Sequence, residues 1–556
     1  MSQLNVNSIF SAGRVGLLDR IIGAVSPATL IKRGQNRLAG IYIDQYMKRA
    51  AYKSAETNRL NEHWSSSNED INLILYRELD KMRSRSRWLL RNNAHAMGLM
   101  NAYISHIIAT GLTLQCRVAR MVRATDPDGN PIIETVEMDA WNDFAESSFN
   151  DWAEAADVRS TDLLPESFVD DQELFLRRLI EDGEALIYLC LDKSFPGVPL
   201  RLMFIEPESL DLSITKSNGN PVVMGVEVDQ RTYRPLAYHI LTGTTEAGLY
   251  QGFGKSIRIP ASDMLHVFKR LRPKQVRGIP HLAVVMQKFF DLDEWTDAEL
   301  LGNKIAACFG VIIEMPDGNG GALKPEGSDK ATDANGNPMS TVEPGIIGYV
   351  PEGAKVNVVS PQKPGATFDM FSKYQLKGIG AGTLGGISYP AMTRDTSGQT
   401  FAGGRLSQSM DYQAFRPFQD FVGRKFCTPV YRRWLQMAVM SNIIIAPGYF
   451  DNSKFWERSE WMPPGWAEGI NPEQDANAAI ARMSSGISSF ASECARRGID
   501  YKRQIRLLGK IKRMTDAEEL VLKGVNQTAE EIKVDAGKSD PAAAELLAEQ
   551  NQIGAL

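Results

Sequence analysis

A change of sequence pattern near residue 282 constrains the fold more than any other feature. Short runs rich in Val, Ile, Leu and aromatic residues fill residues 183–270, with turn-forming residues between them. That texture predicts a β-rich domain. Residues 282–309 then form the longest uninterrupted helical pattern of the chain, roughly 40 Å long at 1.5 Å per residue. The sequence therefore predicts an α+β protein in which a sheet-rich region leads into long helices.

Composition limits the class of protein. The length of 556 residues suggests about 3–4 domains, and a hydrophobic content of 43% with 23% charged residues is ordinary for a globular protein. The net charge of −5 argues against a chain that grips nucleic acid over its whole surface. It leaves open a protein that lets DNA pass with little adhesion. The five cysteines show no CxxC and no Cys/His zinc spacing, which predicts reduced thiols.

Three patterns have two open interpretations each. Asp291, Glu294 and Asp297 recur every three residues along the long helix and form either a solvated face or an acidic channel wall. Residues 386–404 are small, polar and punctuated by Pro and Gly, which predicts an ordered functional loop or a flexible connector. A basic stretch is either a phosphate-facing or partner-facing helix, or the solvated face of a docked helix. Its members are Arg77, Lys81, Arg83, Arg85, Arg87 and Arg91.

Catalytic motifs fail on their context. Residues 380–385 match GxGxxG, but a helical pattern precedes them and Pro390 follows, whereas a dinucleotide site needs a strand before and a helix after. Residues 254–256 read Gly-Lys-Ser, yet the first glycine of a phosphate loop is missing. We expect no catalytic residue, no cofactor and no metal, and no run is long enough to span a membrane. Any DNA pumping must then be powered by a partner.

Six segments, in order, resemble the portal proteins of lambda-like tailed phages. They are RSRWLLRNNAHAMGLMNAYISHIIATGLTLQ (85–115), FLRRLIEDGEALIYL (175–189), FIEPESLD (204–211), GVEVDQRTYRPLAYHIL (225–241), LHVFKRLRPKQVRGIP (265–280) and WMPPGWAEGINPEQDANAAIARMSSGISSFASECARRGID (461–500). The resemblance covers about residues 75–505. The chain departs from the family pattern at 473–475, where Glu-Gln-Asp stands in place of an expected Lys-Glu pair.

The resemblance implies a portal fold: a β-rich wing, two long stem helices flanking a small α/β clip, and a helical crown and C-terminal region. The regions it implies are an N-terminal helical wing part (1–164), the β-rich wing (165–278), a stem helix (279–309), the clip (310–365), a second stem helix (366–384), a tunnel loop (385–404), a helical wing and crown (405–510) and a flexible C-terminal tail (511–556). Within them, the candidate DNA-channel residues are Asp291, Glu294, Asp297, Tyr389, Arg394 and Gln399.

The resemblance also implies a function that is mechanical rather than enzymatic. A homo-oligomeric ring, twelve-fold in the mature particle, would sit at one capsid vertex as the conduit for genome packaging and ejection. Implied partners are the double-stranded DNA in the channel, the terminase large subunit, head-completion or adaptor proteins, and the major capsid and scaffolding proteins. No membrane is implied. The protein would reside in the virion, and in the host cytoplasm during assembly.

Two rival functions stay open at this point. The first is another structural ring or scaffold component of a virion, which would lack the β-rich region followed by paired long helices around a small β insert. The second is a nucleotide-dependent enzyme built on residues 380–385. Binding of ATP or NAD, measured by calorimetry, separates that enzyme from a structural ring.

Overall fold

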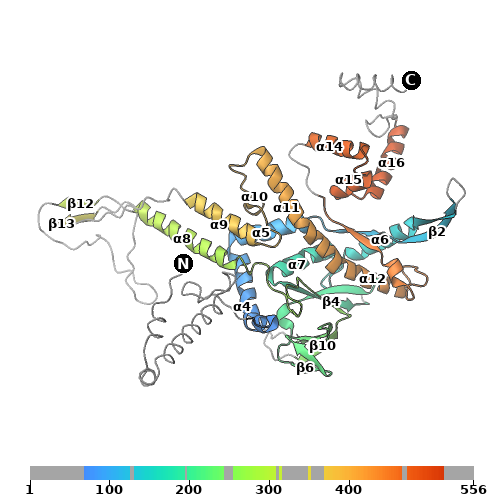
Figure 1. Cartoon of the computed structure of the whole chain (residues 1–556), viewed down its shortest axis with the longest axis horizontal. Helices are drawn as coiled ribbons and strands as arrows, with labels where there is room; N and C mark the ends of the chain where they lie inside the picture. The colour runs from blue at the N-terminus through green and yellow to red at the C-terminus, as the bar shows by residue number, and fades with distance from the viewer. Residues whose placement is uncertain are drawn as a thin grey trace, which may run out of the picture. The chain divides into compact units, whose positions relative to one another are not determined.

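The computed structural model describes residues 68–125, 131–193, 197–242, 255–308, 312–315, 348–351, 368–465 and 472–518. Figure 1 shows the order of their elements along the chain. The α-helices are α4 (Ile71–Asn92), α5 (Ala94–Tyr103), α6 (Asp139–Ala153), α7 (Phe168–Glu181), α8 (Met286–Cys308), α9 (Phe368–Gly382), α10 (Tyr389–Thr393), α11 (Phe401–Val422), α12 (Thr428–Met440), α13 (Ser453–Trp456), α14 (Pro472–Ser484), α15 (Phe490–Arg496) and α16 (Tyr501–Ala517). Short 3-10 or π turns are η2 (Ile104–Ile108), η3 (Pro207–Ser209) and η4 (Gly423–Cys427).

The strands gather into small sheets, as the alternation of apolar runs and turns over 183–270 predicts. They are β1 (Thr113–Cys116), β2 (Ala119–Thr125), β3 (Pro131–Glu137), β4 (Glu184–Leu191), β5 (Leu200–Ile205), β6 (Lys216–Ser217), β7 (Asn220–Val223), β8 (Val226–Val228), β9 (Pro235–Thr242), β10 (Lys255–Pro260), β11 (Met264–Phe268), β12 (Ile312–Met315), β13 (Gly348–Pro351) and β14 (Ser459–Met462). One sheet has the order β11-β4-β5 and another β10-β9-β8-β7-β6, each with antiparallel neighbours. The β-rich region is therefore confirmed.

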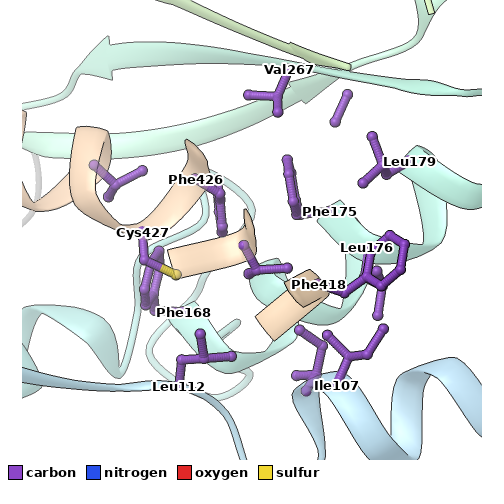
Figure 2. Close-up of a cluster of buried hydrophobic side chains, with 14 of the residues drawn as sticks. Ile107, Leu112, Phe168, Phe175, Leu176, Leu179, Val267, Phe418, Phe426 and Cys427 are labelled. Atoms are coloured by element: carbon purple, nitrogen blue, oxygen red, sulfur yellow. The ribbon is translucent and has the colours of Figure 1, made fainter. Parts of the chain in front are cut away.

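The main core forms where α5, α7, the α11–α12 helices and the β11-β4-β5 sheet meet. Figure 2 shows part of it, with Phe175 and Leu176 of α7 close to Phe426 and Phe418. The rings of Phe175 and Phe426 stack with centroids 4.6 Å apart. Helix α7 begins at a capping box, in which Ser167 and Asp170 exchange hydrogen bonds, and it ends before Gly183, whose φ of +85° favours glycine.

Helices α8 and α9 pack along each other, as Figure 1 also shows. Trp295 of α8 stacks on Phe368 of α9, with centroids 4.8 Å apart. Close approach is helped by Gly382, where an added Cβ would lie 2.8 Å from Val285. The predicted long helix is present, but it begins at Met286 instead of residue 282, because residues 281–285 form turns after Pro280.

The implied regions fall on these elements with several differences. Strands β12 and β13 form a parallel pair within 310–365, and the rest of that implied clip lies outside the described residues. The implied loop 385–404 contains α10 and the first residues of α11, so part of it is helical. The implied tail begins inside α16, while residues 1–67 and 519–556 lie outside the described chain.

Candidate functional site

The three candidate acids of α8 share one exposed face. Asp291, Glu294 and Asp297 are all exposed, and steps of three residues keep them within about 120° around the helix axis. Gln287 Nε2 donates a hydrogen bond to Asp291 Oδ1 (2.7 Å). Among the residues that the structure describes, no Lys or Arg side chain forms an ion pair with any of the three. Their negative charges are therefore available to interact with a molecule that approaches this face of α8.

The opposite face of α8 fixes the orientation of these acids. Phe289 and Leu292 are buried there, Phe289 completely, and they join the main core. A rotation of α8 about its axis would expose this apolar side to water, so burial holds the acidic face outward.

The segment that carries Tyr389, Arg394 and Gln399 is tied down at its start. Ser388 donates from both its backbone N (2.8 Å) and its Oγ (2.5 Å) to the carboxylate of Asp411 on α11. The Tyr389 hydroxyl donates to Asp395 Oδ2 (2.7 Å), and burial together with Asp395 raises the pKa of that hydroxyl. Residues 388–395 therefore form an ordered turn, which favours the first of the two interpretations of this loop.

Helix α10 also packs closely on α5, because Gly98 of α5 has no side chain. An added Cβ at Gly98 would lie only 2.9 Å from the backbone O of Met392, and Met392 is buried in the main core. Arg394 ends the helix in the left-handed region (φ +59°) and is exposed, as is Gln399. These two side chains, unlike that of Tyr389, project into solvent from a fixed support.

Two lysines that the sequence analysis did not single out lie beside this loop. Lys373 and Lys377 of α9 line a hollow of about 300 Å³ together with Tyr389 and Gln399. Lys373 Nζ also pairs with Asp369 (2.9 Å), one helical turn earlier. Their spacing of four residues on a predicted helix was the available signal, but only the fold brings them to the loop.

A buried ionic cluster lies beneath the start of α8, and Glu184 is at its centre. Its Oε1 accepts from Arg83 Nη2 (2.5 Å) and Arg277 Nε (2.8 Å), and its Oε2 accepts from the backbone N of Gly278 (2.6 Å). His266 Nε2 lies 3.0 Å from Oε2. Burial alone would raise the pKa of Glu184, but Arg277, Arg83 and His266 outweigh it and hold the pKa well below its ordinary value.

The cluster joins segments that are distant in sequence. Arg83 belongs to α4, Glu184 to β4 and His266 to β11, while Arg277 precedes the turn into α8. Arg277 also donates to the backbone O of Met224 (2.9 Å) and of Pro207 (3.0 Å), so its guanidinium is fully engaged. The entry to the long helix is therefore fixed against both small sheets by buried, charge-assisted hydrogen bonds.

Beside this cluster, the backbone at Gly183 directly contacts the backbone at Gly278. An added Cβ at Gly278 would lie 2.1 Å from the backbone O of Gly183, and one at Gly183 would lie 2.1 Å from the backbone C of Ile279. Any side chain would force the two backbones apart. The Gly-Glu at 183–184 and the Arg-Gly-Ile-Pro at 277–280, which are separate in the sequence, are thus one structural joint.

The basic stretch of α4 divides between the inside and the outside of the protein. Arg83 is 4% exposed and pairs with Glu184, and Arg87 Nε donates to Asp182 Oδ1 (2.8 Å). Lys81, Arg85 and Arg91 are exposed. Neither interpretation of the whole stretch as a single surface is therefore correct, because Arg83 is buried at the joint and Arg87 is bonded to Asp182 beside it.

The glycine-rich residues 380–385 form the end of α9. The backbone O of Gly380 accepts from Ile387 N (3.0 Å) and from Thr383 Oγ1 (2.6 Å). A helix end lacks the strand, turn and helix that a dinucleotide site needs. In the described part of the chain, no three His, Cys, Asp or Glu side chains are grouped to hold a metal ion, and no helix has the length and apolarity to cross a membrane.

Known proteins similar to this chain are phage portal proteins. The sequence model of a family described as "Phage portal protein, lambda family" matches residues 57–419. The "Probable portal protein" of Halomonas phage phiHAP-1 is 24% identical and the alignment covers 81% of this chain and 83% of that protein. "Portal protein B" of Escherichia phage lambda is 21% identical, with 79% and 84% covered.

Solved structures with a similar chain come from gene transfer agent (GTA) particles. A chain in the "Neck of native GTA particle computed with C12 symmetry" is 14% identical, with a TM-score of 0.37 over 74% of this chain and 93% of that chain. A TM-score of this size does not establish a common fold. The family match, which spans well over half of the sequence, is sufficient by itself: this chain belongs to the lambda family of phage portal proteins.

Proposed function

We propose that this portal protein acts as a passive sleeve: twelve copies close into a ring at one capsid vertex, and duplex DNA slides through it during packaging and ejection. The acidic, outward face of α8 is the observation that supports this most. Duplex DNA carries one negative charge per about 1.7 Å and binds Lys and Arg patches by releasing counterions. A wall of carboxylates repels phosphates instead and keeps friction low.

In this proposal, the regions of the ring are assigned to the following elements. The β-rich wing comprises β4 to β11 within 165–278, the two stem helices are α8 (within 279–309) and α9 (within 366–384), and the clip at 310–365 includes the β12–β13 pair. The tunnel loop at 385–404 is built on α10, the wing and crown at 405–510 comprise α11 to α15 and part of α16, and residues 1–164 and 511–556 complete the wing and the tail.

Self-association is supported by apolar side chains that α8 and α9 leave exposed. Leu301 is 58% exposed, and Met370 and Tyr374 are each 73% exposed. Such side chains gathered on one helix pair are typical of a surface that another chain covers. At 100° per residue Leu301 falls on the same side of α8 as the three acids, whereas Met370 and Tyr374 belong to α9. Packing of neighbouring subunits through Met370 and Tyr374 leaves the acidic face of each α8 available to the channel.

The tunnel loop supplies transient contacts with DNA. Arg394 and Gln399 are exposed on an ordered support, and both side chains reach solvent. Tyr389 contributes less directly, because its hydroxyl is bonded to Asp395. Deleting residues 395–399 should change packaging yield or DNA retention; unchanged values of both would contradict this role.

In this proposal, partner proteins supply the energy that moves the DNA and dock on the ring. The protein is structural and not an enzyme, so the terminase large subunit drives translocation. Head-completion or adaptor proteins close the channel afterwards, and the major capsid and scaffolding proteins surround the ring. The protein resides in the virion, after assembly in the host cytoplasm.

Charge reversal of the α8 face tests the sleeve. In the variant Asp291→Lys, Glu294→Lys, Asp297→Lys, assembled rings should retain duplex DNA and packaging should slow, because each subunit then presents cations to phosphates. The matched control reverses exposed acids away from α8, at Asp151, Glu154 and Asp162. Equal packaging rates in the α8 variant and the control would contradict the acidic wall.

A further inference from the structure

Helix α16 carries a dense basic stripe that the sleeve does not use. Its 17 residues include six basic side chains and one acid, Asp516, in a chain whose net charge is −5. At 100° per residue, five of the six cations fall within about 100° around the axis. These five are Lys502, Arg503, Arg506, Lys510 and Arg513, which we call the α16 stripe.

Two members of the stripe anchor the helix and three are free to act. Lys502 Nζ pairs with Asp139 Oδ1 (2.6 Å) and Glu137 Oε2 (3.0 Å), and Arg506 pairs with Asp143. Arg503, Lys510 and Arg513 are exposed, and none of them is paired with an acid in the part of the chain that the structure describes. The anchors fix the helix on β3 and α6 while the three cations point to solvent.

Helix stability does not account for this arrangement. Cations are favourable near the C-terminus of a helix, which suits Arg513, but they are unfavourable in the first turn. Arg503 lies in that first turn, three residues after Asp500, which caps the helix. Arg503 therefore opposes the helix dipole, and it is exposed and aligned with two other unpaired cations. Binding of a polyanion explains this arrangement better than helix stability does.

The packing of α16 makes a membrane surface the weaker alternative. Thr515 is buried, and Leu508 and Ile511 are partly buried, so the middle of the apolar face is packed against the protein. Ile505, Leu507 and Met514 are exposed, but at 100° per residue they lie at the two edges of that face. A helix that lies on a membrane needs its whole apolar face free.

We propose that the α16 stripe binds the phosphate backbone of duplex DNA, independently of sequence. The choice of DNA as the polyanion rests on the proposed function, since a portal ring handles packaged duplex. Arg503 and Arg513 are ten residues apart, about 15 Å along the helix, and this span covers several phosphates of one strand. The α16 stripe would hold DNA near the ring, whereas the acidic α8 face lets it slide.

Fluorescence anisotropy of the full chain with a labelled 30-bp duplex, over a series of NaCl concentrations, tests this. The variant Arg503→Gln, Lys510→Gln, Arg513→Gln should bind more weakly to AT-rich and GC-rich duplexes alike. The slope of log K against log salt should fall by about 0.9 per lost phosphate contact, thus by about 2.7 for three contacts. Circular dichroism should be unchanged, because all three side chains are exposed.

The control variant Lys81→Gln, Arg85→Gln, Arg91→Gln changes the net charge equally on α4. The proposal requires the α16 variant to lose affinity and salt slope while the control keeps both. Equal losses in the two variants, or no loss in the α16 variant, would overturn it. So would an α16 variant that keeps DNA but loses binding to poly-glutamate, because the partner is then an acidic protein. The measurement holds whether or not rings form, so a failure of ring assembly remains a separate result.

Discussion

Replacing Glu184 by Gln tests whether the buried joint stabilises the fold as its geometry indicates. The carboxylate accepts from Arg83, Arg277 and the backbone of Gly278, and His266 lies within hydrogen-bond distance. The amide of Gln has nearly the same size but no charge, and its NH2 group would face either the two arginines that bond Oε1 or the backbone N–H of Gly278 that bonds Oε2. The substitution therefore leaves buried guanidinium charge without its counterion.

The size of the effect follows from burial. Breaking a buried ion pair by removing one partner costs about 3–5 kcal/mol. Arg277 keeps two backbone carbonyl acceptors, so we expect the lower end, about 3 kcal/mol. The control is Glu206→Gln, which removes an ion pair between Arg87 and a side chain that is 47% exposed. A pair of that kind contributes at most about 1 kcal/mol.

Urea denaturation followed by tryptophan fluorescence measures both free energies of unfolding. We expect Glu184→Gln to lower the free energy of unfolding by about 3 kcal/mol and Glu206→Gln to change it by under about 1 kcal/mol. Equal values for the two variants would refute the reasoning, because the joint would then contribute no more than a surface ion pair.

Three further results are expected. The folded-state pKa of Glu184 lies below its unfolded value, so its contribution to stability is complete above about pH 4.5 and is lost as the pH falls through the folded pKa. The difference in unfolding free energy between wild type and Glu184→Gln should therefore narrow from pH 5 to pH 3. A difference that widens over this range would contradict the reasoning. Gly278→Ala should lower the free energy of unfolding by about 3 kcal/mol or more, measured by thermal or urea unfolding, because its Cβ clashes with Gly183. Gly509→Ala, whose Cβ meets no atom within 4 Å in the interior of α16, should raise it by about 0.5–1 kcal/mol. Similar losses in the two variants would rule out the close approach. Asp411→Asn should speed limited proteolysis after Arg394, since Ser388 loses a charged acceptor, and an unchanged cleavage rate would show that the loop is held elsewhere.

Periodic elements could be predicted from the sequence because they depend on local pattern. The long helix and the β-rich region both appear where alternation and helical spacing predict them. The three acids of α8 fall on one exposed face because a spacing of three residues determines this in any helix. Only the start of α8 differs, by the turns that follow Pro280.

Features that depend on distant partners could not be predicted. Whether Arg83 is solvated or buried is decided by Glu184, 101 residues away, and nothing near either residue indicates the pairing. Helix α10 is a single turn held by Asp411 and by the close approach at Gly98, so its local pattern of Pro and small residues suggested a flexible connector as readily as an ordered loop. Lys373 and Lys377 lie beside residues 388–399 only because of the way α9 packs next to that segment.

Electron microscopy of the purified full-length protein tests the central claim most directly. Class averages should show a closed ring with a central hole, and a reconstruction should place the α8 face with Asp291, Glu294 and Asp297 on the wall of that hole. A particle that stays monomeric under all conditions, or a ring whose channel is lined by a face other than this one, would contradict the account of a passive acidic sleeve for DNA.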